Sequence, residues 1–376
     1  MKACIYPAHI KKSNLGDVLI NTLLIRELSK HCPVFLYGGD VKEMKPLLVM
    51  NNPYHHQIFF VSQGSTLDNI PILRWIKLIQ YLPQLSHVFD PPGHYSEEKV
   101  KRKALLKPLK YILRAKILKL FGIKALRLGV TMGPFSDSGW EMQKKVAKSY
   151  QTIAVRDSKN YEELIKRKVE NISFIDDISF LYQANDFINK ANGQSTEPYV
   201  IVSFRGSIEG KYTDAPYLEK VTQTLKQVVL NNPFEGTYIF SYQVEEDYAV
   251  IQSIAKELAQ LGVRYKIIEK QLTFSEAIEL YYGASYVYTN RLHVALLAMY
   301  NGAAAVAITD VAEHHKLTNV YQDLGLNNIL IDCNGSIEHT FPLNSENLKE
   351  IMTGFEVSSA RKRKSIQDQL THLLAE

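Results

Sequence analysis

The 376-residue sequence has few cysteines and no long apolar segment free of charge. Its three cysteines, Cys4, Cys32 and Cys333, lie far apart and lack metal-ligand or CxxC spacing. They indicate reduced structural thiols in a cytoplasmic protein. Because no run of about 20 apolar residues lacks a charge, we expect no transmembrane helix. The N-terminal MKACIYPAHIKK has too short an apolar run for a signal peptide.

Several catalytic signatures are also missing. The sequence has no Walker loop, HExxH motif, zinc-ligand spacing or GxSxG motif, so it gives no support for zinc hydrolysis or a covalent nucleophile. His314 and His315 are adjacent, and adjacent residues on a helix point apart. We therefore expect no metal site there and no bound cofactor.

Apolar strands alternate with amphipathic helices in both halves of the sequence. Strands are predicted at 3–8, 34–38, 57–62, 87–90, 125–131, 152–157 and 172–177, and again at 199–205, 237–242, 264–268, 285–290, 304–308 and 328–332. Such alternation predicts parallel sheets covered by helices. At this length two domains are expected. The predicted fold is α/β, with two doubly wound, Rossmann-like domains facing a cleft.

The domain boundaries follow from composition. Residues 186–198 (DFINKANGQSTEP) are polar and aperiodic, which predicts a linker between an N-terminal domain, 1–185, and a C-terminal domain, 199–343. Residues 344–376 are predicted to form two helices that cross back to the N-terminal domain.

Two strands of the second half end on polar or cationic side chains. Arg205 ends one strand, and Asn290, Arg291 and His293 follow another. Doubly wound sheets bind ligands at the carboxyl ends of their strands, and a helix N-terminus favours anions. With Lys316 as a third cation, these residues predict a site for a ligand with two anionic groups.

Each of these residues also has a plainer interpretation. His293 could be a hydrogen-bonded core histidine, Arg205 an interdomain salt-bridge partner, and Lys316 a solvated helix residue. The acidic run 245–247 is expected to form a solvated first turn of a helix, and Asp157 to cap the helix that it starts.

Residues 99–127 contain eleven lysines and arginines and no acid. Apolar residues recur among them at helical spacing: Leu105, Leu106, Leu109, Ile112, Leu113, Ile117, Leu120 and Phe121. Such a helix is typical of binding to an anionic membrane surface. The alternative is a helix that packs on the N-terminal sheet and exposes a basic face. The segment lacks an aromatic stacking platform, so nucleic acid is not expected.

Six short segments occur in one order along the chain: NLGDVLI (14–20), GVTMGPF (129–135), VRDSKNYEEL (155–164), DISF (177–180), VSFR (202–205) and RLHVALLA (291–298). Together they resemble the motifs of the polysaccharide pyruvyl transferases, from Asn14 to about Leu326. The resemblance implies a bacterial enzyme of GT-B-like fold that acts in capsule or exopolysaccharide synthesis. Its reaction would transfer the pyruvyl group of phosphoenolpyruvate to a sugar as a ketal.

The resemblance also implies which residues contact the donor. Phosphoenolpyruvate would meet Arg205, Arg291, His293 and the backbone of Leu292. His293 would be the acid or a phosphate ligand, since its ordinary pKa of about 6.5 suits either role. The arginines would stabilise the departing phosphate. Asn290 and Lys316 are added to this set because each lies at or after the end of a predicted strand.

The acceptor side is less defined. The acceptor would be a surface polysaccharide or its lipid-linked precursor, met at the inner face of the plasma membrane. Asp17, in a strand-to-helix turn, is a candidate base or a helix N-cap. Asn14, Asp90 and His94 are further candidates. Two departures from the family pattern fall in this half: PPGHY (91–95) replaces a glycine-rich loop, and Asn160 stands where serine is usual.

Two rival functions remain open from the sequence. A GT-B glycosyltransferase that uses a nucleotide sugar would be expected to carry an acidic residue at a strand end of the C-terminal domain, to bind ribose hydroxyls. A non-catalytic sugar-phosphate-binding protein would bind its ligand without turnover.

Overall fold

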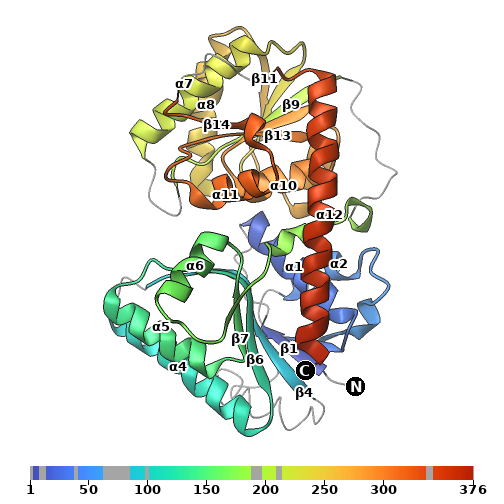
Figure 1. The fold of residues 1–376 in the computed structure, drawn as a ribbon. Helices are drawn as coiled ribbons and strands as arrows, with labels where there is room; N and C mark the ends of the chain where they lie inside the picture. Colours follow the sequence, from blue (N-terminus) through green and yellow to red (C-terminus); the bar gives the residue numbers. More distant parts are fainter. Residues whose placement is uncertain are drawn as a thin grey trace. The chain divides into compact units, whose positions relative to one another are not determined.

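The structure is a computed structural model in which residues 3–7, 14–37, 41–61, 85–97, 101–187, 197–208, 214–335 and 342–375 are described. The chain forms two compact units (Figure 1). The first unit comprises residues 1–11, 17–181 and 362–376, and the second unit comprises residues 12–16 and 182–361. The change of unit after Leu181 falls just before the predicted linker, of which residues 188–196 lie outside the described ones.

A parallel sheet forms the centre of the first unit. Its strands are β1 (Ala3–Pro7), β2 (Val34–Tyr37), β3 (Ile58–Phe60), β4 (Leu85–Asp90), β5 (Gly93–Tyr95), β6 (Lys124–Met132), β7 (Thr152–Val155) and β8 (Ile172–Phe174). They pair in parallel in the order β3-β2-β1-β4-β6-β7-β8, with β5 beside β6.

The second unit contains a smaller parallel sheet. Its strands are β9 (Tyr199–Ser203), β10 (Thr237–Phe240), β11 (Arg264–Ile267), β12 (Tyr286–Thr289), β13 (Ala304–Thr309) and β14 (Leu330–Asp332). They pair in parallel in the order β11-β10-β9-β12-β13-β14. The prediction of two parallel-sheet α/β domains is confirmed.

Helices follow most strands in both units. The first unit has α1 (Leu15–Ser29), α2 (Val41–Val49), α4 (Lys101–Leu120), α5 (Asp137–Ser149) and α6 (Ser158–Lys166). The second has α7 (Ala215–Asn231), α8 (Tyr248–Ala259), α9 (Phe274–Tyr282), α10 (Leu292–Tyr300) and α11 (His315–Asp323). Short 3-10 turns are η1 (His55–Gln57), η3 (Ile178–Leu181), η4 (Ala184–Asp186), η5 (Glu245–Asp247) and η6 (Asn327–Ile329). Helices α4 and α5 pack side by side (Figure 1).

The central strands have continuous apolar sequences because both faces of each sheet are covered. Every residue is buried in β1 (ACIYP), β9 (YVIVS) and β13 (AAVAIT). The edge strand β11 (RYKI) pairs with a single strand, β10, and is largely exposed. This pattern places the core of each unit around its middle strands.

The PPGHY segment is an interrupted strand. β4 and β5 pair with successive parts of the same neighbour, β6, and Pro91 and Pro92 separate them. Proline lacks the N–H that a sheet ladder requires. The two prolines therefore stop the pairing at Asp90, and the chain resumes it at Gly93.

The prediction of two C-terminal helices is wrong, because residues Ser345–Ala375 form one continuous helix, α12 (Figure 1). From Lys362 onward the helix belongs to the first unit. There Lys362 Nζ lies 2.7 Å from Asp176 Oδ1, and Ile366 and Leu370 are fully buried. These contacts hold the end of α12 in the first unit.

Each sheet reverses its strand order at one place, the topological switch point. In the first unit it lies between β1 and β4, and in the second between β9 and β12. Loops that leave two such strands diverge to opposite sides and leave a crevice, where doubly wound folds bind ligands. The two switch points are therefore the places to examine for a site.

Candidate active site

The switch point of the second unit holds the predicted anion-binding residues. Thr289 is paired with Ser203 at the ends of β12 and β9, and Arg205 and Arg291 each follow two residues later. The Thr289 hydroxyl donates to the Ser203 carbonyl at 2.6 Å and accepts from the Arg291 N–H at 3.0 Å. The register of the two strands therefore brings both arginines to one edge of the sheet.

Asn290 fixes the backbone of the Arg205 loop. Its Oδ1 accepts from the Arg205 N–H and its Nδ2 donates to the Arg205 carbonyl, both at 2.8 Å. Nδ2 also donates to the Tyr217 hydroxyl at 2.9 Å. Since the carboxamide is fully buried and bonded to the protein, its observed role is to position Arg205. Direct contact of Asn290 with a ligand stays a prediction.

Arg291 is held by a carboxylate that the sequence analysis assigned to solvent. Its guanidinium forms an ion pair with Asp247, and Nη1 donates to Gln243 Oε1 at 3.4 Å. Asp247 is only 5% exposed, so the expectation of a solvated turn holds for Glu245 and Glu246 and is wrong for Asp247. Arg291 Nε is buried and has no hydrogen-bond partner among the described residues.

The two arginines lie close enough to repel each other. Burial, followed by the charge of Arg205, lowers the pKa of Arg291 to about 9, while Glu246 acts in the opposite direction. The guanidinium stays charged at neutral pH. The charges of Arg205 and Arg291 repel each other, and an anion bound beside both would relieve that repulsion.

Arg205 acts on a buried histidine as well. Burial and then the charges of Arg205 and Lys316 lower the pKa of His314 to about 3, so its imidazole is neutral at pH 7. His314 Nδ1 lies 2.8 Å from Thr309 Oγ1, which lies 3.0 Å from the Tyr217 hydroxyl. This chain of hydrogen bonds links the end of β13 to the Asn290 carboxamide and stiffens the edge that carries the cations.

The remaining donor-side residues occupy the starts of α10 and α11. Leu292 is buried and His293 is half-buried in the first turn of α10, where unpaired backbone N–H groups point outward. Lys316 is half-buried in the first turn of α11. Gly16 lies against the imidazole of His293, since a Cβ on it would sit 2.1 Å from Nδ1. A side chain in place of this motif glycine would displace the histidine.

The switch point of the first unit opens into a pocket of about 470 Å³. Its lining includes Asp17, Asn21, Asp90, His94, Lys107 and Arg114. The structure thus brings together three acceptor-side candidates, Asp17, Asp90 and His94. Asn14, the fourth, is absent from this lining and occupies the N-cap position of α1, with Oδ1 accepting from the Gly16 N–H at 3.1 Å. The capping role considered for Asp17 therefore belongs to Asn14.

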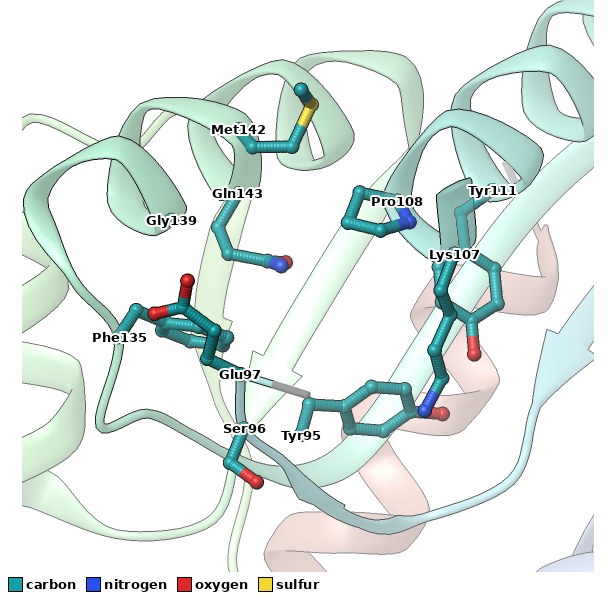
Figure 2. A pocket seen from close by; sticks show the side chains of 10 residues that line it. All are labelled: Tyr95, Ser96, Glu97, Lys107, Pro108, Tyr111, Phe135, Gly139, Met142 and Gln143. Atoms are coloured by element: carbon teal, nitrogen blue, oxygen red, sulfur yellow. The ribbon is translucent and has the colours of Figure 1, made fainter. Parts of the chain in front are cut away.

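A smaller cavity shares Tyr95, Lys107 and Tyr111 with this pocket. Figure 2 shows Lys107, Pro108 and Tyr111 projecting into it from α4, opposite Glu97 and Gln143. Its volume of about 30 Å³ suits a water molecule and is far too small for a sugar. The larger pocket is the one that can receive a substrate.

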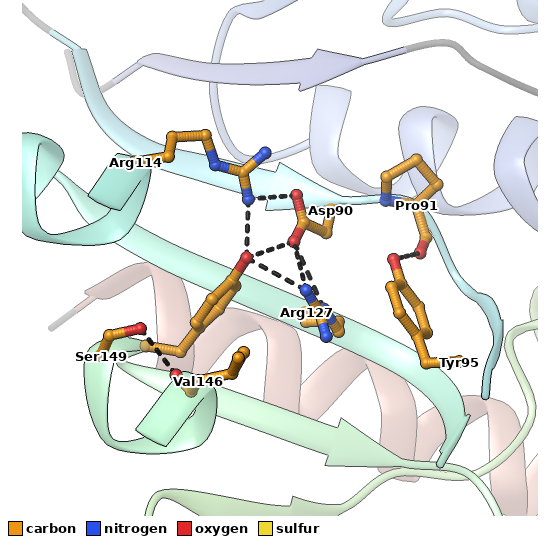
Figure 3. A network of polar contacts seen from close by, with 8 residues as sticks. Asp90, Pro91, Tyr95, Arg114, Arg127, Val146 and Ser149 are labelled. Carbon is orange, nitrogen blue, oxygen red and sulfur yellow. Dashed lines mark hydrogen bonds and ion pairs between the residues drawn. The ribbon is translucent and has the colours of Figure 1, made fainter. Parts of the chain in front are cut away.

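Asp90 forms the centre of a buried network and is a poor candidate for a general base (Figure 3). Its carboxylate accepts from Arg114 at 2.5 Å, from Arg127 at 3.0 Å and from the Tyr150 hydroxyl at 2.5 Å. Burial alone would raise the pKa of Asp90, but the charges of Arg114 and Arg127 outweigh it and lower the pKa. A carboxylate stabilised in this way accepts a proton weakly.

Aromatic rings complete the enclosure of Arg127. Its guanidinium carbon lies 4.0 Å from the centre of the Tyr95 ring, 4.6 Å from Tyr111 and 4.8 Å from Tyr150. Cations are attracted to ring faces at such distances. Burial opposes its charge, but Tyr150, Tyr95 and Asp90 together raise the pKa of Arg127. Asp90 and the rings therefore stabilise the buried charge of Arg127 within the protein.

Asp17 and His94 remain as polar groups that can meet a hydroxyl in the larger pocket. Asp17 is half-buried in the first turn of α1, and its carbonyl accepts from Asn21 Nδ2 at 2.7 Å. His94 is exposed, and its Nε2 bonds the Gly133 carbonyl. Across the described ranges, no group of three or more histidine, cysteine or acidic residues is arranged to hold a metal ion.

A family model of polysaccharide pyruvyl transferases matches residues 14–310. The chain belongs to this family. Among curated proteins no sequence matches it. The match includes Arg205 and Arg291 of the second unit and, apart from Pro7, the residues that line the larger pocket of the first unit.

Solved structures establish the fold. Over the full length of both chains, the Anabaena protein Alr3699/HepE in complex with UDP and glucose has 14% identity and a TM-score of 0.56. UDP-GlcNAc 2-epimerase of Methanocaldococcus jannaschii, likewise matched over both full chains, has 12% identity and a TM-score of 0.54. A Rickettsia africae glycosyltransferase has 13% identity and a TM-score of 0.52, over 100% of this chain and 93% of that one. These neighbours have the GT-B fold, as predicted.

The family motifs of the first unit have structural roles. Arg156 of VRD pairs with Asp177 of DISF at 3.1 Å, and both side chains are buried. Asp157 caps α6 by accepting from the Asn160 N–H, as expected. Asn160 bonds both the N–H and the carbonyl of Met132, at 2.9 and 2.7 Å. The replacement of the usual serine thus ties α6 to the end of β6.

Within the described part of the chain, no helix is both long enough and apolar enough to cross a membrane.

Proposed function

We propose that the chain transfers the pyruvyl group of phosphoenolpyruvate to two hydroxyls of a sugar in a polysaccharide or its lipid-linked precursor. Family membership supports pyruvyl transfer. The observation that carries the donor assignment is the pair of arginines at the β9–β12 switch point, where Arg205 lowers the pKa of Arg291. Phosphoenolpyruvate carries a phosphate and a carboxylate, and these two anions match the two guanidinium groups.

The proposed reaction conserves atoms and charge without a redox partner. A proton adds to the methylene carbon of phosphoenolpyruvate, and positive charge develops at the neighbouring carbon. One sugar hydroxyl attacks that carbon and loses its proton. The second hydroxyl then attacks the same carbon, and the C–O bond to phosphate breaks. The proton of that second hydroxyl leaves with the phosphate as hydrogen phosphate. The products are the ketal and inorganic phosphate.

The second unit would bind the donor and stabilise the leaving group. Arg205 and Arg291 would hold the two anions, and the N–H groups at the start of α10 would donate to one of them. His293, in that same turn, would serve as the acid or as a phosphate ligand. Lys316 is a further cation for the phosphate, because its charge already reaches His314.

The first unit would bind the acceptor sugar in the pocket between β1 and β4. A volume of about 470 Å³ is within the usual range for small-molecule sites. Asp17 or His94 would accept the hydroxyl protons, because Asp90 is committed to Arg114 and Arg127. The acceptor assignment therefore rests on a pocket, whereas the donor assignment rests on charge.

A nucleotide-sugar glycosyltransferase is the second candidate, since the Anabaena neighbour is described with UDP and glucose. A buried acidic residue, Asp247, does follow a C-terminal-domain strand, but its carboxylate pairs with Arg291 instead of being open to a ribose. This pairing favours the pyruvyl transferase.

Calorimetry on the whole chain tests the proposal, with phosphoenolpyruvate and UDP-glucose titrated separately. Phosphoenolpyruvate should bind the wild type and bind Arg291→Ala at least about tenfold more weakly, because a charge-assisted contact contributes about 1.5–3 kcal/mol. Arg167→Ala, which removes the arginine directly after α6 in the first unit, is the matched control and should bind normally. Binding of UDP-glucose without any response to phosphoenolpyruvate would establish the glycosyltransferase instead.

A further inference from the structure

Helix α4 exposes an unusual amount of apolar surface. Leu106 is 53% exposed, Leu109 and Leu113 are each 49% exposed, and Leu120 is 84% exposed. Phe121, directly after the helix, is 58% exposed. Single exposed leucines are common on soluble proteins, but a contiguous set marks a surface that meets another apolar surface.

The exposed leucines share one face of the helix. Residues 106, 109, 113 and 120 are spaced by three, four and seven positions, which keeps them within a sector of about 60°. The opposite face holds Pro108, Ala115 and Leu118, which are buried. Packing of α4 onto α5 and β6 therefore uses the other face and leaves the leucine stripe outward.

Lysines flank the stripe on both sides. Lys110 lies along one edge, Lys116 lies along the other with Lys119 further round the helix, and all three are exposed. The sequence from 99 to 127 contains no acidic residue that could neutralise them. The leucine stripe with lysines on both sides is complementary to a surface whose outer layer is anionic and whose interior is apolar.

We propose that the outward face of α4 binds the protein to an anionic lipid surface. The leucines and Phe121 would enter the boundary between headgroups and acyl chains, while the lysine stems extend to the phosphates. The alternative considered for this segment, an apolar face packed on the sheet beneath a solvated basic face, does not hold for the outward leucines. A nucleic acid would use the lysines and leave the leucines in water.

The inner face of α4 places the docking surface close to the larger pocket of the first unit. Lys107, Tyr111 and Arg114 line the larger pocket of the first unit. The two faces belong to one helix, so a membrane bound to the leucines would lie within a helix diameter, about 10 Å, of that pocket. The docking proposal itself does not depend on which reaction the protein performs.

Sedimentation of the full chain with vesicles tests the proposal. Vesicles of phosphatidylcholine with phosphatidylglycerol should bind the protein, vesicles of phosphatidylcholine alone should not, and added salt should weaken binding. Lys110→Glu/Lys116→Glu/Lys119→Glu should lower the partition coefficient at least about 100-fold, as expected for three basic residues near the surface. Leu109→Gln/Leu113→Gln/Leu120→Gln should lower it about tenfold or more without any change in net charge.

A matched control separates this face from net charge. Lys159→Glu/Lys166→Glu/Lys256→Glu makes the same change in net charge at exposed lysines of α6 and α8 and should bind as well as the wild type. No binding to the anionic vesicles, equal binding to neutral ones, or equal losses in the control and the α4 lysine variant would overturn the proposal. Unchanged binding of the leucine variant would also overturn it.

Discussion

Both units hold buried arginines near their switch points but in opposite electrostatic states: Arg127 lies in β6 beside the end of β4, and Arg291 follows the end of β12. In the first unit, Asp90 and the surrounding tyrosines compensate Arg127 and raise its pKa. In the second, burial and the neighbouring Arg205 lower the pKa of Arg291. Arginines that raise one another's cost of ionisation gain more from a bound anion than an arginine whose pKa is raised by its surroundings. From this difference we expect a structural role for the arginines of the first unit and anion binding by those of the second.

The largest effect should come from breaking the compensated network. Asp90→Ala leaves the buried charge of Arg127 without its carboxylate, which should lower the free energy of unfolding by about 3–5 kcal/mol. Urea denaturation measures this loss. Glu141→Ala, which removes the carboxylate of an exposed ion pair with Lys144, should cost under about 1 kcal/mol. Similar small losses in both variants would show that Asp90 compensates nothing.

His314 should make stability depend on pH. Its folded-state pKa is lowered to about 3, below an unfolded value of about 6.5, so the unfolded state binds the proton first as pH falls. The contribution of His314 to the free energy of unfolding is therefore complete above pH 6.5 and declines below it. At pH 5 it is smaller by about 2 kcal/mol. His314→Asn can keep a polar contact to Thr309 without titrating. Urea unfolding at pH 7 and pH 5 should show the variant losing about 2 kcal/mol less than the wild type, and identical losses would contradict this.

The smallest expected effect is a change in ligand affinity when Asp247, the carboxylate paired with Arg291, loses its charge. Asp247→Asn keeps the shape of the side chain but removes the negative charge that neutralises Arg291. The anion of a ligand would then face less competition, and the Kd of phosphoenolpyruvate should fall about three- to tenfold, worth about 1 kcal/mol. Calorimetry at constant ionic strength measures it. Weaker binding in this variant would mean that Asp247 orients Arg291 for the ligand.

Strand and helix patterns were sufficient to predict the fold. Buried segments such as YVIVS and YVYT have the sequence pattern of covered parallel strands, and Arg205 and Arg291 follow their ends. The single long C-terminal helix was missed because its middle is polar and gives no clear continuous apolar stripe.

The sequence could not reveal how charges are paired. Asp247 lies 44 positions before Arg291 and Asp90 lies 37 before Arg127, and no local pattern connects such partners. Asp90 was a candidate base because it ends a strand, and Asp247 was expected to be solvated because acidic residues favour the first turn of a helix. Only tertiary packing decides whether a carboxylate meets a cation, water or substrate, so the base of the reaction was the least predictable residue.

One calorimetric comparison tests the central claim that the second unit binds the anionic donor and the first unit satisfies its own charges. Phosphoenolpyruvate is titrated into the wild type, Arg205→Ala and Arg114→Ala. The account predicts at least about tenfold weaker binding for Arg205→Ala and unchanged affinity for Arg114→Ala. Retained affinity in Arg205→Ala with loss in Arg114→Ala would contradict it.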